Sequence, residues 1–95
     1  MPLFVLELEF PPERARRLAV RPEHRAYLEQ LKTSGKVIAA GPWSDDSGAL
    51  IVYDAIDEAE VARVLAEDPY VTEGVSGERT VRRWQPILGG TITVA

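Results

Sequence analysis

The feature that most constrains the fold is a segment from Leu3 to Phe10 in which every second side chain is a large apolar one. Successive side chains of an extended chain point to opposite faces, so this segment is predicted to be a strand. Pro11-Pro12 ends it, because proline has no backbone N–H for a sheet. Such a strand needs a second layer to cover its apolar face. That face carries Phe4, Leu6, Leu8 and Phe10.

Two later segments have helical spacing and can supply the layer. The first is predicted to start at Pro22 and to end at Gly35, with the inward stripe His24, Tyr27, Leu28 and Leu31. The basic segment before Pro22, ERARRLAV, is expected to be a helical turn or loop. The second helix is predicted to start at Asp57, where Glu60 makes a capping-box-like pattern, and to end before Pro69. Its inward stripe is Val61, Val64, Leu65 and Asp68.

Three further strands are predicted over Lys36–Trp43, Ala49–Asp54 and Glu78–Gln85, and Val71–Gly77 is predicted to be a loop. The turn from Ser44 to Gly48 joins the first two of these strands into a hairpin. Both hairpin strands are apolar on both faces, which is unusual for a sheet with helices on one side only. We therefore expect a second apolar surface to cover the other face, and a homodimer would provide it.

Strand, helix, strand, strand, helix, strand is the order of the ferredoxin-like sandwich. We accordingly predict an α+β fold, a ferredoxin-like βαββαβ sandwich whose four-stranded antiparallel sheet has the spatial order 4-1-3-2. The two helices then lie antiparallel on one face. This arrangement brings the start of the first helix beside the end of the second, so His24 and Asp68 are predicted to meet.

His24 is the only histidine of the chain, and its inward position has two interpretations. It is either a buried histidine whose ring nitrogens find a carbonyl or water, or one member of a functional pair. Asp68 is predicted at the carboxyl end of a helix, where the helix dipole disfavours a carboxylate. That position requires a donor or cation, and His24 can supply one.

Composition excludes several classes of protein. The 95 residues are expected to form a single domain, and a net charge of −4 argues against nucleic acid as a partner. The chain has no cysteine and only one histidine, so neither a disulfide nor a histidine-cluster metal site is expected. The first ten residues include Glu7 and Glu9 and lack the pattern of a signal peptide, and no stretch is long enough to span a membrane. A cytoplasmic location is expected.

The chain resembles the YciI-like, or YCII-related, family of small dimeric α/β-barrel proteins. The resemblance covers nearly the whole domain but not the tail after Pro86. It implies a homodimer and a proposed active site formed by a His-Asp pair, at the positions of His24 and Asp68. Some members are associated with eliminating chloride from chlorinated hydroxylated rings. The matching residues are His24, Tyr27-Leu28, Leu31, Gly35, Gly41-Pro42, Gly48, Asp68-Pro69 and Trp84.

Two functions follow as hypotheses. The first is a small-molecule enzyme of the lyase or isomerase kind, in which His24 and Asp68 move protons without a cofactor. The alternative is a non-catalytic module that binds a metabolite or regulates. Substrate-binding residues are predicted among the basic segment and the nearby aromatic side chains, although the latter also fit simple core or rim positions; they are Arg17, Arg21, Tyr27, Trp43 and Tyr70. The tail 87–95 is predicted to reach a partner subunit.

Overall fold

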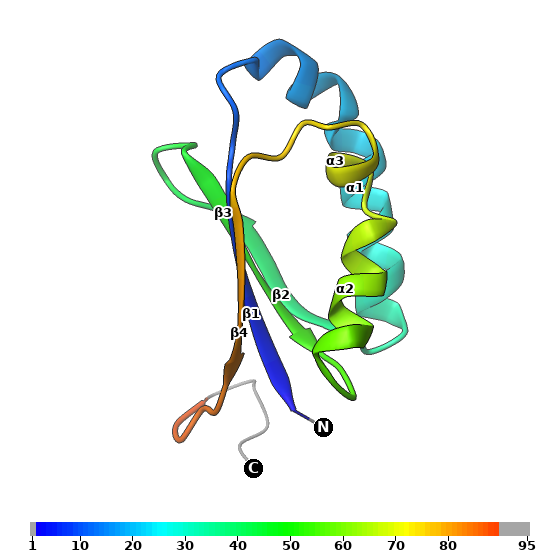
Figure 1. Ribbon diagram of the computed structural model, residues 1–95, viewed down its shortest axis with the longest axis vertical. Helices are drawn as coiled ribbons and strands as arrows, with labels where there is room; N and C mark the ends of the chain where they lie inside the picture. Colours follow the sequence, from blue (N-terminus) through cyan, green and yellow to red (C-terminus); the bar gives the residue numbers. More distant parts are fainter. Residues whose placement is uncertain (1, 90–95) are drawn as a thin grey trace.

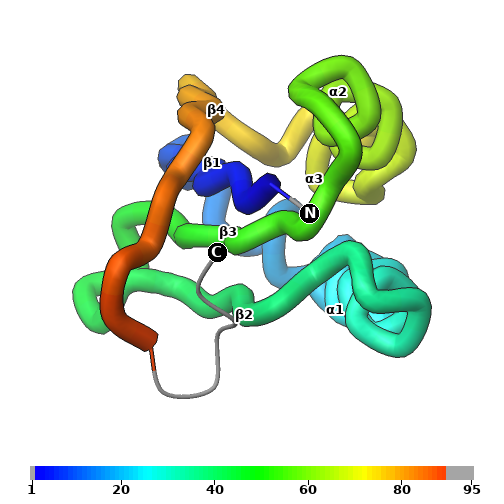
Figure 2. The backbone as a smooth tube through the Cα atoms, turned by 90° about the horizontal axis from the view of Figure 1, so that it is seen from below, coloured from blue at the N-terminus to red at the C-terminus, as the bar shows by residue number. Residues whose placement is uncertain are grey.

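The computed structural model describes residues 2–89. Its antiparallel sheet has the strand order β2-β3-β1-β4, which confirms the predicted ferredoxin-like α+β fold. Figure 1 shows the helices together on one side of this sheet. In Figure 2, α1 lies towards the β2 edge and α2 towards the β4 edge. The elements are β1 (Leu3–Glu9), α1 (Arg14–Thr33), β2 (Val37–Pro42), β3 (Gly48–Asp54), α2 (Glu58–Ala66), α3 (Pro69–Thr72) and β4 (Arg79–Trp84).

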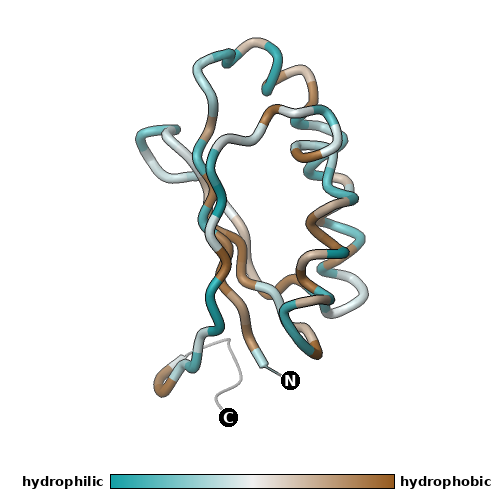
Figure 3. The backbone as a smooth tube through the Cα atoms, in the orientation of Figure 1, coloured by the Kyte–Doolittle hydropathy of each residue, from teal (hydrophilic) through white to brown (hydrophobic). Residues whose placement is uncertain are grey.

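The core lies between the sheet and the helices. The alternation in β1 works as predicted, because Phe4, Leu6 and Leu8 are buried on the helix side whereas Glu7 and Glu9 are exposed. In Figure 3 the apolar colour is concentrated in the middle of the strands and along α2. The buried apolar residues form one cluster, in which β1 and β3 supply the floor and both long helices supply the cover; its members include Leu6, Ile51, Tyr53, Leu31, Val61 and Leu65.

Helix α1 begins at Arg14, not at Pro22, so the predicted helix start was wrong. Pro22 lies inside the helix, where it removes one backbone hydrogen bond and normally costs about 3 kcal/mol. Tertiary contacts hold the preceding turns in place. Arg16 donates to the carbonyl of Glu73 at 2.7 Å, and Arg17 donates to Asp46 at 2.7 Å. The basic segment is therefore helical and anchored by these contacts, not a loop, and of its arginines only Arg17 is buried.

The end of α2 also differs from the prediction. The helix ends at Ala66, and Asp68 is the N-cap of the short helix α3, where its carboxylate accepts a hydrogen bond from the backbone N–H of Tyr70 at 2.9 Å. Pro69 occupies the first turn of α3, a position that suits proline. Asp68 thus lies at a favourable helix start, not at an unfavourable helix end. The predicted loop from Val71 onwards begins as the rest of α3.

The hairpin between β2 and β3 approaches β1 closely. A side chain at Gly48 would collide with the backbone carbonyl of Leu8, so only glycine fits there. Asp46, in the turn, has a positive φ of 60°, a conformation that aspartate tolerates better than most residues. Its carboxylate is directed back towards α1 and meets Arg14 and Arg17.

The sheet face away from the helices is apolar at its centre. Val52 and Leu3 are buried there, while Trp84 retains 39 % of its exposure. Val5 and Leu50 complete this outer sheet face, and Arg82 and Arg83 border it. The apolar residues predicted on the second face of the hairpin thus contribute to this apolar outer sheet face. In the part of the chain that the structure describes, no helix is long and apolar enough to cross a membrane.

Candidate functional site

His24 and Asp68 form a buried pair. Nδ1 of His24 lies 2.7 Å from Oδ1 of Asp68, although the two residues are 44 positions apart in the sequence. Asp68 is only 1 % exposed and His24 only 7 %. The His24 ring stacks on the ring of Tyr70, with 3.7 Å between centroids and an interplanar angle of 2°. The carboxylate below and the aromatic ring beside it fix the imidazole in position.

The hydrogen bond sets the tautomer of the imidazole. An ionised carboxylate only accepts, so Nδ1 of His24 carries the proton that it donates to Asp68. Nε2 is then the unprotonated nitrogen of the neutral ring, and it is available as a base. The carboxylate also stabilises the imidazolium that forms when Nε2 takes a proton. This is the geometry that general acid–base chemistry requires of a histidine.

A pocket of about 250 Å³ opens beside this pair. His24, Tyr70 and Phe10 line it, together with arginines from α1 and small residues from β2 and β3. The space suits a small molecule, since the volume is close to the lower end of ordinary ligand sites. The remaining lining residues are Arg17, Arg21, Arg25, Leu28, Ala40, Gly41, Pro42, Asp46, Ala49 and Ile51.

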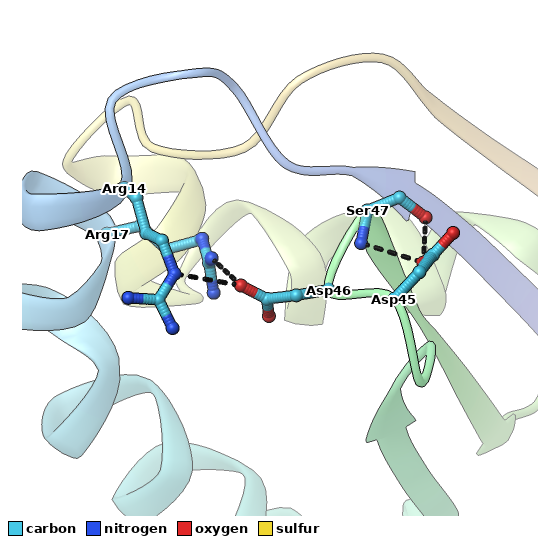
Figure 4. A network of polar contacts seen from close by, with 5 residues as sticks. All are labelled: Arg14, Arg17, Asp45, Asp46 and Ser47. Atoms are coloured by element: carbon cyan, nitrogen blue, oxygen red, sulfur yellow. Dashed lines mark hydrogen bonds and ion pairs between the residues drawn. The ribbon is translucent and has the colours of Figure 1, made fainter.

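Arg17 is the best-held cation of the pocket. It is 3 % exposed, donates to Asp46 at 2.7 Å and lies over the ring of Phe10, 3.9 Å from its centroid. Figure 4 shows Arg14 and Arg17 converging on Asp46 from α1. Hydrogen bonds from Arg17 and then Arg14 hold the pKa of the Asp46 carboxyl below its ordinary value. Asp46 therefore stays ionised in mildly acidic solution, and the hairpin stays tied to α1.

Tyr70 combines two opposing influences. Burial raises the pKa of its hydroxyl, whereas the neighbouring positive charges of Arg17, Arg21 and Arg25 lower it. Burial dominates, so the hydroxyl remains protonated at neutral pH. All three arginines line the same pocket as Tyr70.

The structure brings together most, but not all, of the predicted site residues. His24, Arg17, Arg21 and Tyr70 line the pocket, and Asp68 lies behind His24. Tyr27 does not line it, because its hydroxyl donates to the carbonyl of Val64 at 2.6 Å and its ring packs against the core.

Trp43 lies elsewhere as well. It is 43 % exposed and lines a different hollow, beside Glu7 and Glu9. The residues that sequence reasoning missed are Phe10, Arg25 and Asp46. Arg25 carried a detectable signal, since it follows Arg17 and Arg21 at intervals of four along one helix. Asp46 carried none, because its role depends on how the hairpin turn meets α1.

Within residues 2–89, no group of three or more His, Cys, Asp or Glu side chains is arranged to hold a metal ion.

Comparisons with known proteins agree with this fold and order of residues. The model of the YCII-related domain matches residues 2–85. The chain belongs to the YCII-related family. Protein YciI of Escherichia coli O6:H1 is 34 % identical over 83 residues, which cover 77 % of this chain and 85 % of that protein. Uncharacterized protein YjpA of Bacillus subtilis is 32 % identical over 62 residues, covering 65 % and 72 % of the two chains.

One solved structure extends the comparison to a ligand. It is 5-chloro-2-hydroxyhydroquinone dehydrochlorinase (TftG) from Burkholderia phenoliruptrix AC1100, in complex with 2,5-dihydroxybenzoquinone. The TM-score is 0.75 at 28 % identity, and the match covers 86 % of this chain and 92 % of that one. A protein of similar fold is thus named for the dehydrochlorination of a hydroxylated ring and binds such a ring in its solved structure.

Proposed function

We propose that this YCII-related protein is a lyase or isomerase that moves protons on a small, ring-shaped substrate without a cofactor. The observation that carries the proposal is the 2.7 Å contact between Asp68 and His24 beside the pocket. His24 acts as the catalytic base and acid through Nε2, and Asp68 is the residue that positions and charges it. Tyr70 holds the His24 ring by stacking on it, and Arg21 supplies a positive charge for the ligand.

The chemistry balances without an external oxidant. In an elimination, Nε2 takes a proton from the substrate, the electrons left behind form a new π bond, and the leaving group departs with its bonding pair. In an isomerisation, the same proton returns to a different atom. Both outcomes need one base that can also act as an acid near neutral pH, which a histidine with a carboxylate partner provides. The dehydrochlorinase activity named for the structural relative is a reaction of the first kind.

The decisive experiment follows chemistry and binding separately. The native protein is incubated with 5-chloro-2-hydroxyhydroquinone and related hydroxylated rings in D₂O, and chloride release and deuterium incorporation are recorded by NMR. We expect turnover, and we expect His24→Asn to lower kcat by at least about 100-fold. Tyr27→Phe is the matched control, because it removes a half-buried side-chain hydrogen bond outside the pocket. A ligand that binds but returns unchanged and unexchanged would establish the non-catalytic alternative.

We also propose that the outer sheet face is covered by a second copy of the chain. This face has an apolar centre, including Val5, Leu50 and Val52, bordered by Arg82 and by the exposed ring of Trp84. Ile87 and Leu88 follow Trp84 after two intervening residues and are more than four-fifths exposed, at 84 % and 87 %. Exposed apolar area of this kind favours association. The rest of the predicted partner-binding tail, residues 90–95, lies outside the described part of the chain.

The dimer is tested by light scattering with Leu50→Glu, which places a charge in the outer sheet face and leaves the helix side of the sheet intact. We expect the native protein to have twice the monomer mass at micromolar concentration and the variant to be monomeric. A native monomer would refute the proposal. Ile56→Glu, at an exposed apolar residue in the connection between β3 and α2, is the control for a general effect of added charge.

A further inference from the structure

Three arginines, Arg17, Arg21 and Arg25, follow one another at intervals of four along α1. Residues spaced in this way lie on the same face of a helix, and like charges at that spacing destabilise it. All three nevertheless line the pocket, on the same side as His24. A repulsive row of charges that faces a pocket suggests that something negative is bound there.

The first member of the row already has its counter-ion. Asp46 accepts from Arg17 at 2.7 Å and from Arg14 at 3.1 Å, as Figure 4 shows. The aromatic face of Phe10 covers the Arg17 guanidinium from another side. Asp45 does not share this role, because its carboxylate is bonded to Ser47 within the turn. Arg17 is therefore neutralised inside the protein and serves as a fixed wall of the pocket.

The other two members have no such partner. Across residues 2–89, no carboxylate lies within 4.0 Å of the charged groups of Arg21 or Arg25. Arg21 is half-buried and Arg25 exposed, so both are open to a ligand. Among the lining residues the pocket has three arginines and a single carboxylate, that of Asp46. Its charge is opposite in sign to the net charge of the whole chain, −4.

From this imbalance we propose that Arg21 and Arg25, and not Arg17, form the receptor for an oxyanion carried by the substrate, so that the substrate is an ionised ring compound, a phenolate or ring carboxylate. The inference rests on the proposed function for its ring-shaped substrate and extends it to the substrate's charge. His24 lies between the two arginines in the sequence and lines the same pocket. In a protein of negative net charge, such a local positive field draws anions to this pocket in particular.

The binding experiment uses three probes in calorimetry at pH 7. The first is 2,5-dihydroxybenzoquinone, whose acidic ring hydroxyls are ionised at that pH, and the second is 2,5-dihydroxybenzoate, which carries a carboxylate. The third is the uncharged 2,5-dimethoxybenzoquinone. We expect at least one anionic probe to bind about tenfold or more tightly than the uncharged one, and this advantage to shrink as salt is added. The preferred probe identifies whether the oxyanion is a phenolate or a carboxylate.

Charge removal then locates the receptor. Arg21→Gln and Arg25→Gln are each expected to weaken the anionic probe by about five- to tenfold and to leave the uncharged probe unaffected. Arg63→Gln, an equal charge change on the exposed side of α2, is the control and should change binding by less than about twofold. The melting temperature of the Arg25 variant should be unchanged or higher, because the substitution relieves repulsion within α1.

The results separate this inference from the proposed function. Native-like binding of the anionic probe by the Arg21→Gln, Arg25→Gln double variant would refute the receptor, and so would binding of none of the anionic probes by the native protein at millimolar concentration. If binding depends on the two arginines but no ring compound is turned over or exchanged, the receptor stands and catalysis falls. If turnover depends on His24 but not on the arginines, the catalytic proposal stands and the receptor is refuted.

Discussion

Replacing Asp68 with asparagine is expected to impair turnover far more than folding. Oδ1 of Asp68 accepts both hydrogen bonds, from His24 at 2.7 Å and from the backbone N–H of Tyr70 at 2.9 Å, whereas the buried Oδ2 has no partner among the described residues. An asparagine can keep both bonds through its carbonyl oxygen and place its amide nitrogen where Oδ2 was. The fold then loses the charge of the acceptor but retains the geometry.

The expected magnitudes follow from this geometry. Hydrogen bonds to charged groups contribute about 1.5–3 kcal/mol and neutral ones about 0.5–1.5 kcal/mol, so the asparagine variant should lose roughly 1–2 kcal/mol of the free energy of unfolding. Asp68→Ala leaves two buried donors unpaired at about 1–3 kcal/mol each and should lose roughly 3 kcal/mol. In a domain of this size that loss lowers the melting temperature by more than about 10 °C. For Asp68→Asn, kcat should fall by about 10²- to 10⁴-fold, because the imidazolium has lost its counter-charge.

The single histidine makes the assay direct. Nitrogen-15 NMR of the imidazole distinguishes the two neutral tautomers, and we expect the native ring to carry its proton on Nδ1. Asp57→Asn is the matched control, since Asp57 is also an N-cap whose carboxylate accepts from a backbone N–H, that of Glu60 at 2.9 Å. Asparagine caps a helix about as well as aspartate, so this control should change neither stability nor turnover. Native turnover by Asp68→Asn would refute the role assigned to the pair.

Three further predictions concern the scaffold of the site. Arg17→Met should lower the free energy of unfolding in urea by about 1–2 kcal/mol, because it breaks a buried ion pair whose partner, Asp46, can regain contact with water. Stability should fall in acid, because hydrogen bonds from Arg17 and Arg14 hold the pKa of Asp46 below its ordinary value. Their contribution is fully present above the unfolded value of about 3.9 and disappears as pH falls through the lower folded value. Between pH 2 and 5, the melting temperature should therefore change less with pH for Asp46→Asn than for the native protein. Tyr27→Phe should lose about 1 kcal/mol of thermal stability with the hydrogen bond to Val64 and leave turnover intact.

The architecture was predictable because strand periodicity and chain order are both local signals. Alternation in β1 identifies the buried face correctly, and the succession of strands and helices admits few topologies. The pairing of His24 with Asp68 was also predicted, but through a partly wrong reason. Asp68 meets the histidine from an N-cap position between two helices, not from the last turn of one. The pattern Asp-Pro marks a helix start as readily as a helix end, and only the following residues decide between them.

The first turns of α1 were not predictable, because hydrophobic periodicity detects helices only where they bury apolar side chains. Arg17 is inward-facing and buried, but it is charged, and Pro22 then imitates a helix start. The counter-ion of Arg17 is Asp46, which lies in a hairpin turn 29 residues away, so no local sequence pattern predicts the contact.

The charged inner face of α1 explains both why hydrophobic periodicity missed its first turns and why the pocket lies beside His24. A helix whose inner face carries arginines cannot bury that face against an apolar sheet, because an unpaired buried charge is too costly. The chain therefore either supplies a carboxylate, as Asp46 does for Arg17, or leaves space in which the charge meets solvent and ligands, as it does beside Arg21. The pocket lies where α1 changes from this charged face to the apolar stripe that ends in Leu31. His24 stands at that boundary, with enough burial to hold its ring and enough space to reach a substrate.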